Sequence, residues 1–152
     1  MQRGGVSEDY PSQRPVRFMG AGGISKDGPE DRGLSERCIA GFNAGPPFMP
    51  SAYNNNIQIF QHKDHIVIMT EMVHDARVVP LDENHDLHDD VRLWSGDSRG
   101  YWDGDTLVVE TKNFSDMVQS FLASPYGNAR EKSLMERFTR VNETTVEYEQ
   151  NI

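Results

Sequence analysis

Cysteine, basic residues and long apolar runs are all scarce in this sequence. The single cysteine, Cys38, excludes an internal disulfide, and we expect it to be a small buried hydrophobic residue. Lysine and arginine number 15 against 24 acidic residues, and the resulting net charge of -9 disfavours nucleic acid as a partner. No apolar stretch reaches the roughly 18 residues of a membrane-spanning helix. No apolar segment follows the first residues, as a signal peptide would require.

The first part of the chain also lacks apolar periodicity. Residues 1–33 are rich in Gly, Pro, Ser, Arg and Asp, and we expect an extended arm, either disordered or lying across the domain or a neighbouring molecule. Residues 34–152 are expected to form a single domain, because a chain of 152 residues suffices for one core. The apolar content is only 36%, and much of the shortfall lies in the arm.

Beyond the arm, alternating and β-branched segments predict strands. Asn56–Gln61 and His65–Val73 are expected to pair as a hairpin, with Ala76–Leu81 as a third strand. Asp103-Gly104 lies between two alternating segments and indicates a second hairpin, because glycine tolerates the positive φ of a tight turn. The remaining predicted strands are Val91–Trp94, Leu134–Val141 and Thr144–Gln150.

Short strands joined mostly by tight turns predict an all-β, mainly antiparallel fold. We expect a small calycin- or lipocalin-like barrel, or a sandwich, with an interior pocket. No helical pattern in the sequence is long enough for an α/β fold.

A set of short, polar-rich segments gives the chain a specific pattern: Tyr53-Asn-Asn-Asn56, Glu71-Met-Val-His-Asp-Ala-Arg77, Pro80-Leu-Asp82, Gly96-Asp-Ser-Arg-Gly100, Trp102-Asp-Gly-Asp-Thr-Leu-Val-Val-Glu110 and Asn113-Phe114. In these segments the chain resembles a group of bacterial proteins of uncharacterised activity that are usually predicted to be exported. The resemblance covers most of the chain, from Asp31 to the C-terminus, and those relatives usually continue past the point where this chain stops. It implies an exported bacterial protein, periplasmic or extracellular, and it brings no activity with it.

The stretch from Glu71 to Arg77 holds four ionisable side chains between two apolar segments, and buried charges are costly unless they are paired or useful. In a strand that runs to Val73, Glu71 shares a face with Val67 and Met69, and we expect both faces of this strand to be covered. Glu71 is then either half of a structural ion pair with Arg77 or a general acid or base in a pocket.

His74 and Asp75 allow two interpretations. As an imidazole with its orienting carboxylate, the pair supplies a catalytic base with a suitable intrinsic pKa. As part of a turn in which Asp75 binds the backbone, the pair needs no function.

Further polar and aromatic residues are candidates for substrate binding. Asp97 and Arg99 share a face if extended, and they form either a site for an anionic or polyhydroxyl ligand or a turn held by a salt bridge. Asparagine side chains near Tyr53 either cap backbone groups or bind a ligand. Aromatic pocket walls suit many ligands. The predicted substrate-binding residues are Tyr53, Asn55, Arg77, Arg92, Trp94, Asp97, Arg99 and Trp102.

Two His-x-x-His pairs raise the question of a metal site. His62 and His65 form one pair, and His85 and His88 form the other. Both lie in polar segments without an apparent third fixed ligand, so we expect neither a metal nor another cofactor.

Three hypotheses for function follow. The first is a cofactor-free acid/base enzyme of the lyase, isomerase, cyclase or hydratase kind, acting on a small organic molecule in a barrel pocket. In it, Glu71 and His74 transfer protons, Asp75 orients the imidazole, and an arginine holds an anion. The second is a lipocalin-like protein that binds a small molecule without turnover. The third is a structural protein that assembles as a homo-oligomer through strand or arm exchange.

One geometric criterion separates the first two hypotheses. If Glu71 and His74 point into one cavity, the geometry favours the enzyme. If each charge instead makes a separate structural contact, the geometry favours the binding protein.

Overall fold

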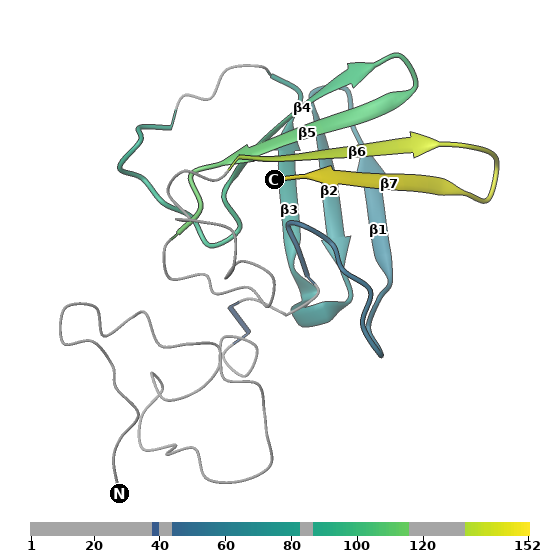
Figure 1. Cartoon of the computed structure of the whole chain (residues 1–152), viewed down its shortest axis with the longest axis horizontal. Coiled ribbons are helices and arrows are strands. Elements are labelled where there is room, and N and C mark those ends of the chain that lie inside the picture. The colour runs from purple at the N-terminus through teal and green to yellow at the C-terminus, as the bar shows by residue number, and fades with distance from the viewer. Residues whose placement is uncertain (1–37, 40–43, 83–86, 116–132) are drawn as a thin grey trace, which may run out of the picture.

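The computed structural model describes residues 38–39, 44–82, 87–115 and 133–152, and in these residues the chain forms two antiparallel sheets (Figure 1). The first sheet has the order β1-β2-β3 and consists of β1 (Ile57–Gln61), β2 (His65–Thr70) and β3 (Ala76–Pro80). The second has the order β4-β5-β6-β7 and consists of β4 (Asp97–Asp103), β5 (Thr106–Lys112), β6 (Leu134–Arg140) and β7 (Val146–Asn151).

The prediction of an all-β, antiparallel fold is confirmed. Figure 1 shows β4–β7 crossing β1–β3 at a steep angle, and the two sheets remain open in the described part of the chain. The architecture is therefore sandwich-like, and the described strands do not close into a barrel. The predicted arm at residues 1–33 and the metal candidate His85 lie outside the described residues.

The core lies between the two sheets and follows from strand alternation. In β2, Ile66 and Ile68 are buried and share one face, and Val109 in β5 faces them from the second sheet. Burying such aliphatic side chains contributes about 1.5–3 kcal/mol each. The buried core cluster consists of Phe48, Ile66, Ile68, Val79, Leu107, Val109 and Phe138.

The first predicted hairpin is confirmed, but its second strand is shorter than predicted. β2 ends at Thr70, and a 3₁₀ turn, η2 (Met72–His74), reverses the chain into β3. Val73 and His74 have φ values of 53° and 55°, a left-handed conformation that no strand can contain. The expectation that both faces of this strand are covered is wrong, because the second sheet covers only one face and Met69 on the other is exposed.

The Asp-Gly hairpin is confirmed with its turn one position later than predicted. Asp103 still pairs with Thr106, so the two turn residues are Gly104 and Asp105. Gly104 has a φ of +61°, as a two-residue turn with glycine at its first central position requires. The last predicted hairpin is also confirmed, as β6 and β7.

Two sequence-based expectations are corrected by the fold. The predicted strand Val91–Trp94 is reduced to one isolated bridge, in which Leu93 pairs with Phe114. Cys38 is exposed rather than buried, because the core draws its side chains from the strands and from Phe48.

No helix among the described residues has the length and apolar character needed to cross a membrane.

Where β4 approaches β3, the sheets meet at a glycine. A Cβ atom at Gly100 would lie 2.9 Å from Cγ1 of Val79 and 3.4 Å from Cδ2 of Leu81. Only a residue without a side chain allows the two sheets to approach this closely.

Replacing this glycine tests the close approach. Gly100→Val is expected to lower the free energy of unfolding by about 1–3 kcal/mol, because the added methyl groups overpack the junction. Met135→Val, at an exposed position of β6, is the control and should change it by less than about 0.5 kcal/mol. Urea denaturation measures both, and equal stability of the two variants would contradict the packing described.

Candidate functional site

A buried ion pair joins the two sheets. Arg77 extends from β3, and its Nη1 and Nη2 donate to Oε2 and Oε1 of Glu136 on β6, at 2.5 Å and 3.2 Å. The two side chains are 7% and 0% exposed. Two parallel charge-assisted hydrogen bonds of this kind fix direction as well as distance, so the pair determines how β3 and β6 lie against each other.

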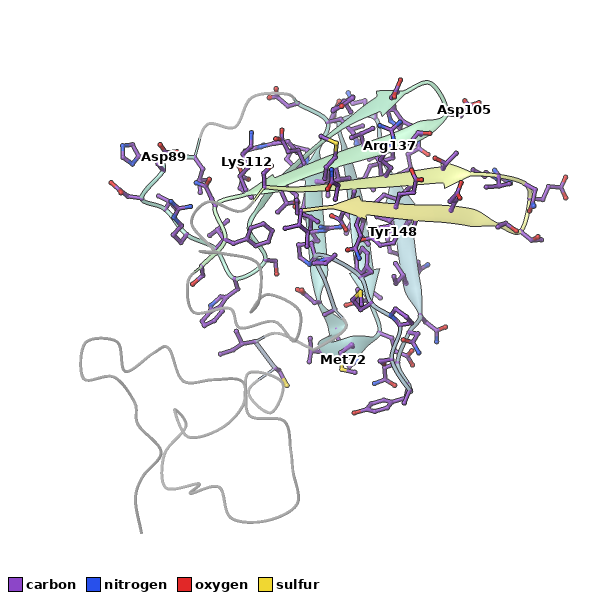
Figure 2. All side chains as sticks on the ribbon, in the orientation of Figure 1. Met72, Asp89, Asp105, Lys112, Arg137 and Tyr148 are labelled. Carbon is purple, nitrogen blue, oxygen red and sulfur yellow. The ribbon has the colours of Figure 1, made fainter. Side chains whose placement is uncertain are left out.

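Tyr148 and Phe48 complete the site. The Tyr148 hydroxyl, on β7 (Figure 2), donates to Oε1 of Glu136 at 2.8 Å and accepts from the backbone N–H of Phe48 at 3.1 Å. The Arg77 guanidinium carbon lies 5.1 Å from the centroid of the Phe48 ring, within the range of a cation–π contact. The Phe48 and Tyr148 rings lie edge to face, with centroids 5.8 Å apart. One charged pair is therefore enclosed by aromatic rings.

The environment keeps the Tyr148 hydroxyl protonated. Burial first, and the negative charge of Glu136 next, raise the pKa of this phenol well above its ordinary value of 10.0. The positive charge of Arg77 acts in the opposite direction but is a weaker influence. Tyr148 therefore remains a hydrogen-bond donor to Glu136 throughout the neutral pH range.

One donor of the site has no partner. Arg77 Nε is buried and makes no hydrogen bond in the described part of the chain, although both Nη atoms are used. A buried donor without a partner costs about 1–3 kcal/mol. Arg77 thus has one N–H available for an acceptor.

Strand alternation explains why these charges point inward. Arg77 alternates with Val79 on β3, and Glu136 lies between Leu134 and Phe138 on the inward face of β6. In the buried part of each strand, one charged residue interrupts an otherwise apolar stripe. The two interruptions face each other once the sheets are packed.

Glu71 does not pair with Arg77, so that expectation is corrected. Because β2 ends at Thr70, the exposed Glu71 side chain lies at the turn, beside the start of β1. Its Oε2 accepts from Nδ2 of Asn56 at 2.9 Å and from the Asn56 backbone N–H at 3.3 Å. The local candidate for the partner of Arg77 is thus replaced by Glu136, which lies 59 positions along the chain.

His74 and Asp75 lie in the same turn. The backbone carbonyl of Asp75 accepts from the Thr70 N–H at 2.8 Å and closes the turn. His74 is exposed, and no hydrogen bond joins its ring to the Asp75 carboxylate, both residues being in the described part of the chain. The turn interpretation of this pair therefore matches the contacts.

The other predicted binding residues are spread over the molecule. Asp97 and Arg99 share a face of β4, as predicted, and form an ion pair at 3.5 Å on the outward face of the second sheet. Asn55 caps the backbone, since its Oδ1 and Nδ2 both bond Ser51 main-chain atoms at 2.7 Å. Tyr53 is exposed, whereas Arg92 and Trp94 are partly buried outside the strands.

Of the predicted set, only Arg77 and Trp102 belong to the inward faces of the sheets. Trp102 lies directly across from Leu107, which lies across from the core residue Phe138. Trp102 nevertheless remains 43% exposed. Three other inward-facing apolar side chains are also exposed: Ile57 and Ile59 on β1, and Val146 on β7. The inward faces are thus left uncovered on the side of β1.

Metal-binding side chains do not gather in the described residues, where no group of three His, Cys, Asp or Glu lies close enough to hold an ion. His62 and His65 do lie together, with ring centroids 4.7 Å apart.

The chain matches no family model, no curated protein and no solved structure.

Sequence reasoning missed Glu136, Tyr148 and Phe48. A signal for Glu136 was present, because a carboxylate between Leu134 and Phe138 interrupts an inward stripe. No local signal identifies Phe48, which precedes the first strand and reaches the site only through tertiary packing.

Removing the negative charge of the buried pair tests its importance. Glu136→Gln is expected to lower the free energy of unfolding by about 3–5 kcal/mol, because Arg77 is left as a buried charge without a counterion. Glu110→Gln is the matched control, since Glu110 pairs with Lys112 at 2.8 Å on a partly exposed surface. The control should cost less than about 1 kcal/mol. Urea denaturation compares them, and similar losses would contradict the special role of the buried pair.

The Tyr148 pKa gives a pH prediction. Because the folded state raises this pKa, the contribution of Tyr148 to stability is complete below the unfolded-state pKa of about 10 and is lost as the pH rises towards the folded value. Tyr148→Phe should therefore flatten the alkaline fall in the free energy of unfolding above about pH 10. Urea denaturation across this pH range measures the slope, and an unchanged slope would show that Tyr148 ionises as freely in the folded protein as in the unfolded chain.

Proposed function

We propose that the protein binds a small organic molecule between its two sheets, in the manner of a lipocalin and without chemical turnover. The observation that supports this most is the Arg77 guanidinium, which is buried beside aromatic rings and keeps one N–H without a partner. By the criterion set out above, Glu71 and His74 also favour binding over acid/base catalysis, because both are exposed in a surface turn and the Glu71 carboxylate bonds Asn56.

The chemistry of the site defines the class of ligand. Arg77 Nε suits an oxygen acceptor such as a carboxylate or a carbonyl, and the aromatic rings around it suit an apolar body. The uncovered inward-facing side chains, Ile59 and Trp102 among them, offer the apolar wall along which such a body would lie. The ligand is therefore an apolar molecule with one anionic or carbonyl group.

This proposal includes two expectations from the sequence. A calycin-like relation fits the meander order of the strands, which follow one another along the chain within each sheet. An exported bacterial setting fits a carrier of small molecules.

Neighbouring residues on β4 provide a matched test of the ligand site. Trp102 and Tyr101 are exposed to the same extent, 43% and 42%, but they lie on opposite faces of the second sheet. Isothermal titration with decanoate and 1-naphthoate should show saturable binding to the unmodified protein. Trp102→Ala should weaken that binding about tenfold, equivalent to ~1.4 kcal/mol, whereas Tyr101→Ala should leave it unchanged.

Two results would oppose the proposal. One is the absence of saturable binding for both carboxylates. The other is an equal loss of affinity in the two variants, which would place the ligand away from the inward face.

An acid/base enzyme is the second candidate, and one observation favours it. Val73 and His74 both adopt the left-handed conformation, and strain of about 1–3 kcal/mol per residue is concentrated at functional sites. Any carboxylate that binds can be incubated with the protein and followed by NMR. Conversion that Glu71→Gln abolishes would establish the enzyme, and an unchanged compound would exclude turnover of that ligand.

A further inference from the structure

The outer strand of the first sheet is unusually open. β1 (Ile57–Gln61) lies at the edge, and all five of its residues are exposed. Its sequence, Ile-Gln-Ile-Phe-Gln, contains no charge and no proline, although edge strands commonly carry one or the other to prevent pairing with another chain. β7, one of the two edge strands of the second sheet, contains Glu147 and Glu149 and so has that protection.

The hydrogen-bond pattern shows which amides of β1 face outward. His62 donates its backbone N–H to His65 at 2.9 Å, and Glu71 donates to Asn56 at 2.9 Å, on either side of the β1–β2 ladder. Because antiparallel ladders alternate, the residues between them that bond β2 are Gln58 and Phe60. The N–H and C=O groups of Ile57, Ile59 and Gln61 therefore point away from β2, towards a position where the described residues place no strand.

The second sheet extends over that position. β4, β5 and β6 have seven residues each, so each strand is roughly 23 Å long at about 3.3 Å per residue. The first sheet, which these strands cross, has three strands spaced about 4.8 Å apart and is only roughly 14 Å wide. Figure 1 shows the β4–β5 and β6–β7 hairpins reaching beyond β1. Their inward-facing Trp102 and Val146 are the half-exposed residues on the underside. Among the described residues, about one or two more strands at this spacing would fit beside β1.

The overhanging hairpin tips are acidic. Asp105 and Glu143 lie in the two turns, and Figure 2 shows Asp105 at the β4–β5 tip. Asp103 and Glu147 lie next to them on the outward face of the second sheet. Arg137 is already paired with Asp103 at 2.9 Å, and Arg140 donates to the Asn142 carbonyl at 3.2 Å. With a net charge of -9 over the chain, this surface favours a cationic partner.

We propose that the β1 edge binds an extended segment of a partner protein, as an added antiparallel or parallel strand. The segment places apolar residues under the overhanging hairpins, and lysines or arginines on its opposite face give it the positive charge that favours binding to a chain of net charge -9. Main-chain bonds to Ile57, Ile59 and Gln61 provide the affinity, and the apolar side chains provide the specificity. A second copy of this chain fits less well for two reasons. A two-fold axis that pairs β1 with β1 would place both overhanging sheets on the same side, and the second chain would bring another net charge of -9.

A synthetic strand tests this proposal. The probe is a fluorescein-labelled peptide of nine residues in which valine or isoleucine alternates with lysine or threonine, and fluorescence anisotropy with the full chain measures its affinity. Saturable binding is expected. Replacing the lysines by glutamates should weaken it at least tenfold, because the chain carries a net charge of -9.

Two variants at one position separate the main chain from the side chain. Ile59→Pro removes the outward N–H without breaking a bond to β2, and it should weaken peptide binding at least tenfold. Ile59→Val keeps the N–H and shortens only the side chain, so it should lose much less affinity than Ile59→Pro does. If Ile59→Pro fails to fold, the same comparison is made on the peptide, by N-methylating the amides that face β1.

The outcomes are decisive in each direction. Loss of binding on proline substitution or N-methylation supports the added strand. Equal affinity of the methylated and unmethylated peptides, or no saturable binding, overturns it. A dimer of the unmodified chain in light-scattering measurements that Ile59→Pro dissociates would also overturn it, since the occupant would then be a second copy.

Discussion

Two opposite charges that are buried between the sheets determine how the sheets of this protein meet. Removing an ion from water costs several kcal/mol, and an internal pair recovers that cost only with good geometry and further hydrogen bonds. The Arg77–Glu136 pair has both, because its two bonds are parallel and Tyr148 donates a third to the same carboxylate. A slide of one sheet over the other by one residue would break both bonds between Arg77 and Glu136, because these two cross from β3 to β6. The pair therefore selects one arrangement from those that apolar packing alone would allow.

The same arrangement also determines which apolar faces and which strand edge remain uncovered. Arg77 lies on β3, the strand farthest from β1, so the second sheet is held over one side of the first and its hairpins extend beyond the other. Uncovered apolar side chains and an unpaired strand edge then follow at β1. The proposed ligand and the proposed partner strand both depend on this asymmetry. The ligand uses the guanidinium and the inward faces, and the partner uses the backbone of β1 together with the inward face of the overhanging hairpins.

The sequence allowed the strands and most of their ends to be predicted, because alternation and turn chemistry are local signals. Asp103-Gly104 identified a hairpin, and the apolar run before Glu71 identified β2. The length of β2 was not predictable in the same way, since the left-handed turn at Val73 has no glycine to mark it. The partner of Arg77 was missed because a nearby carboxylate, Glu71, was available, whereas Glu136 meets Arg77 only after two sheets pack. Pairing across sheets depends on topology, which alternation does not specify.

The central claim is that Arg77 and Glu136 act as one unit. The most direct measurement is a double-mutant cycle from urea unfolding of the unmodified protein, Arg77→Met, Glu136→Leu and the double variant. The account predicts a coupling energy of at least about 2 kcal/mol, with the double variant more stable than either single variant because no charge is left unpaired. A coupling below about 0.5 kcal/mol, with additive losses, would contradict the account and show that apolar packing alone holds the sheets together.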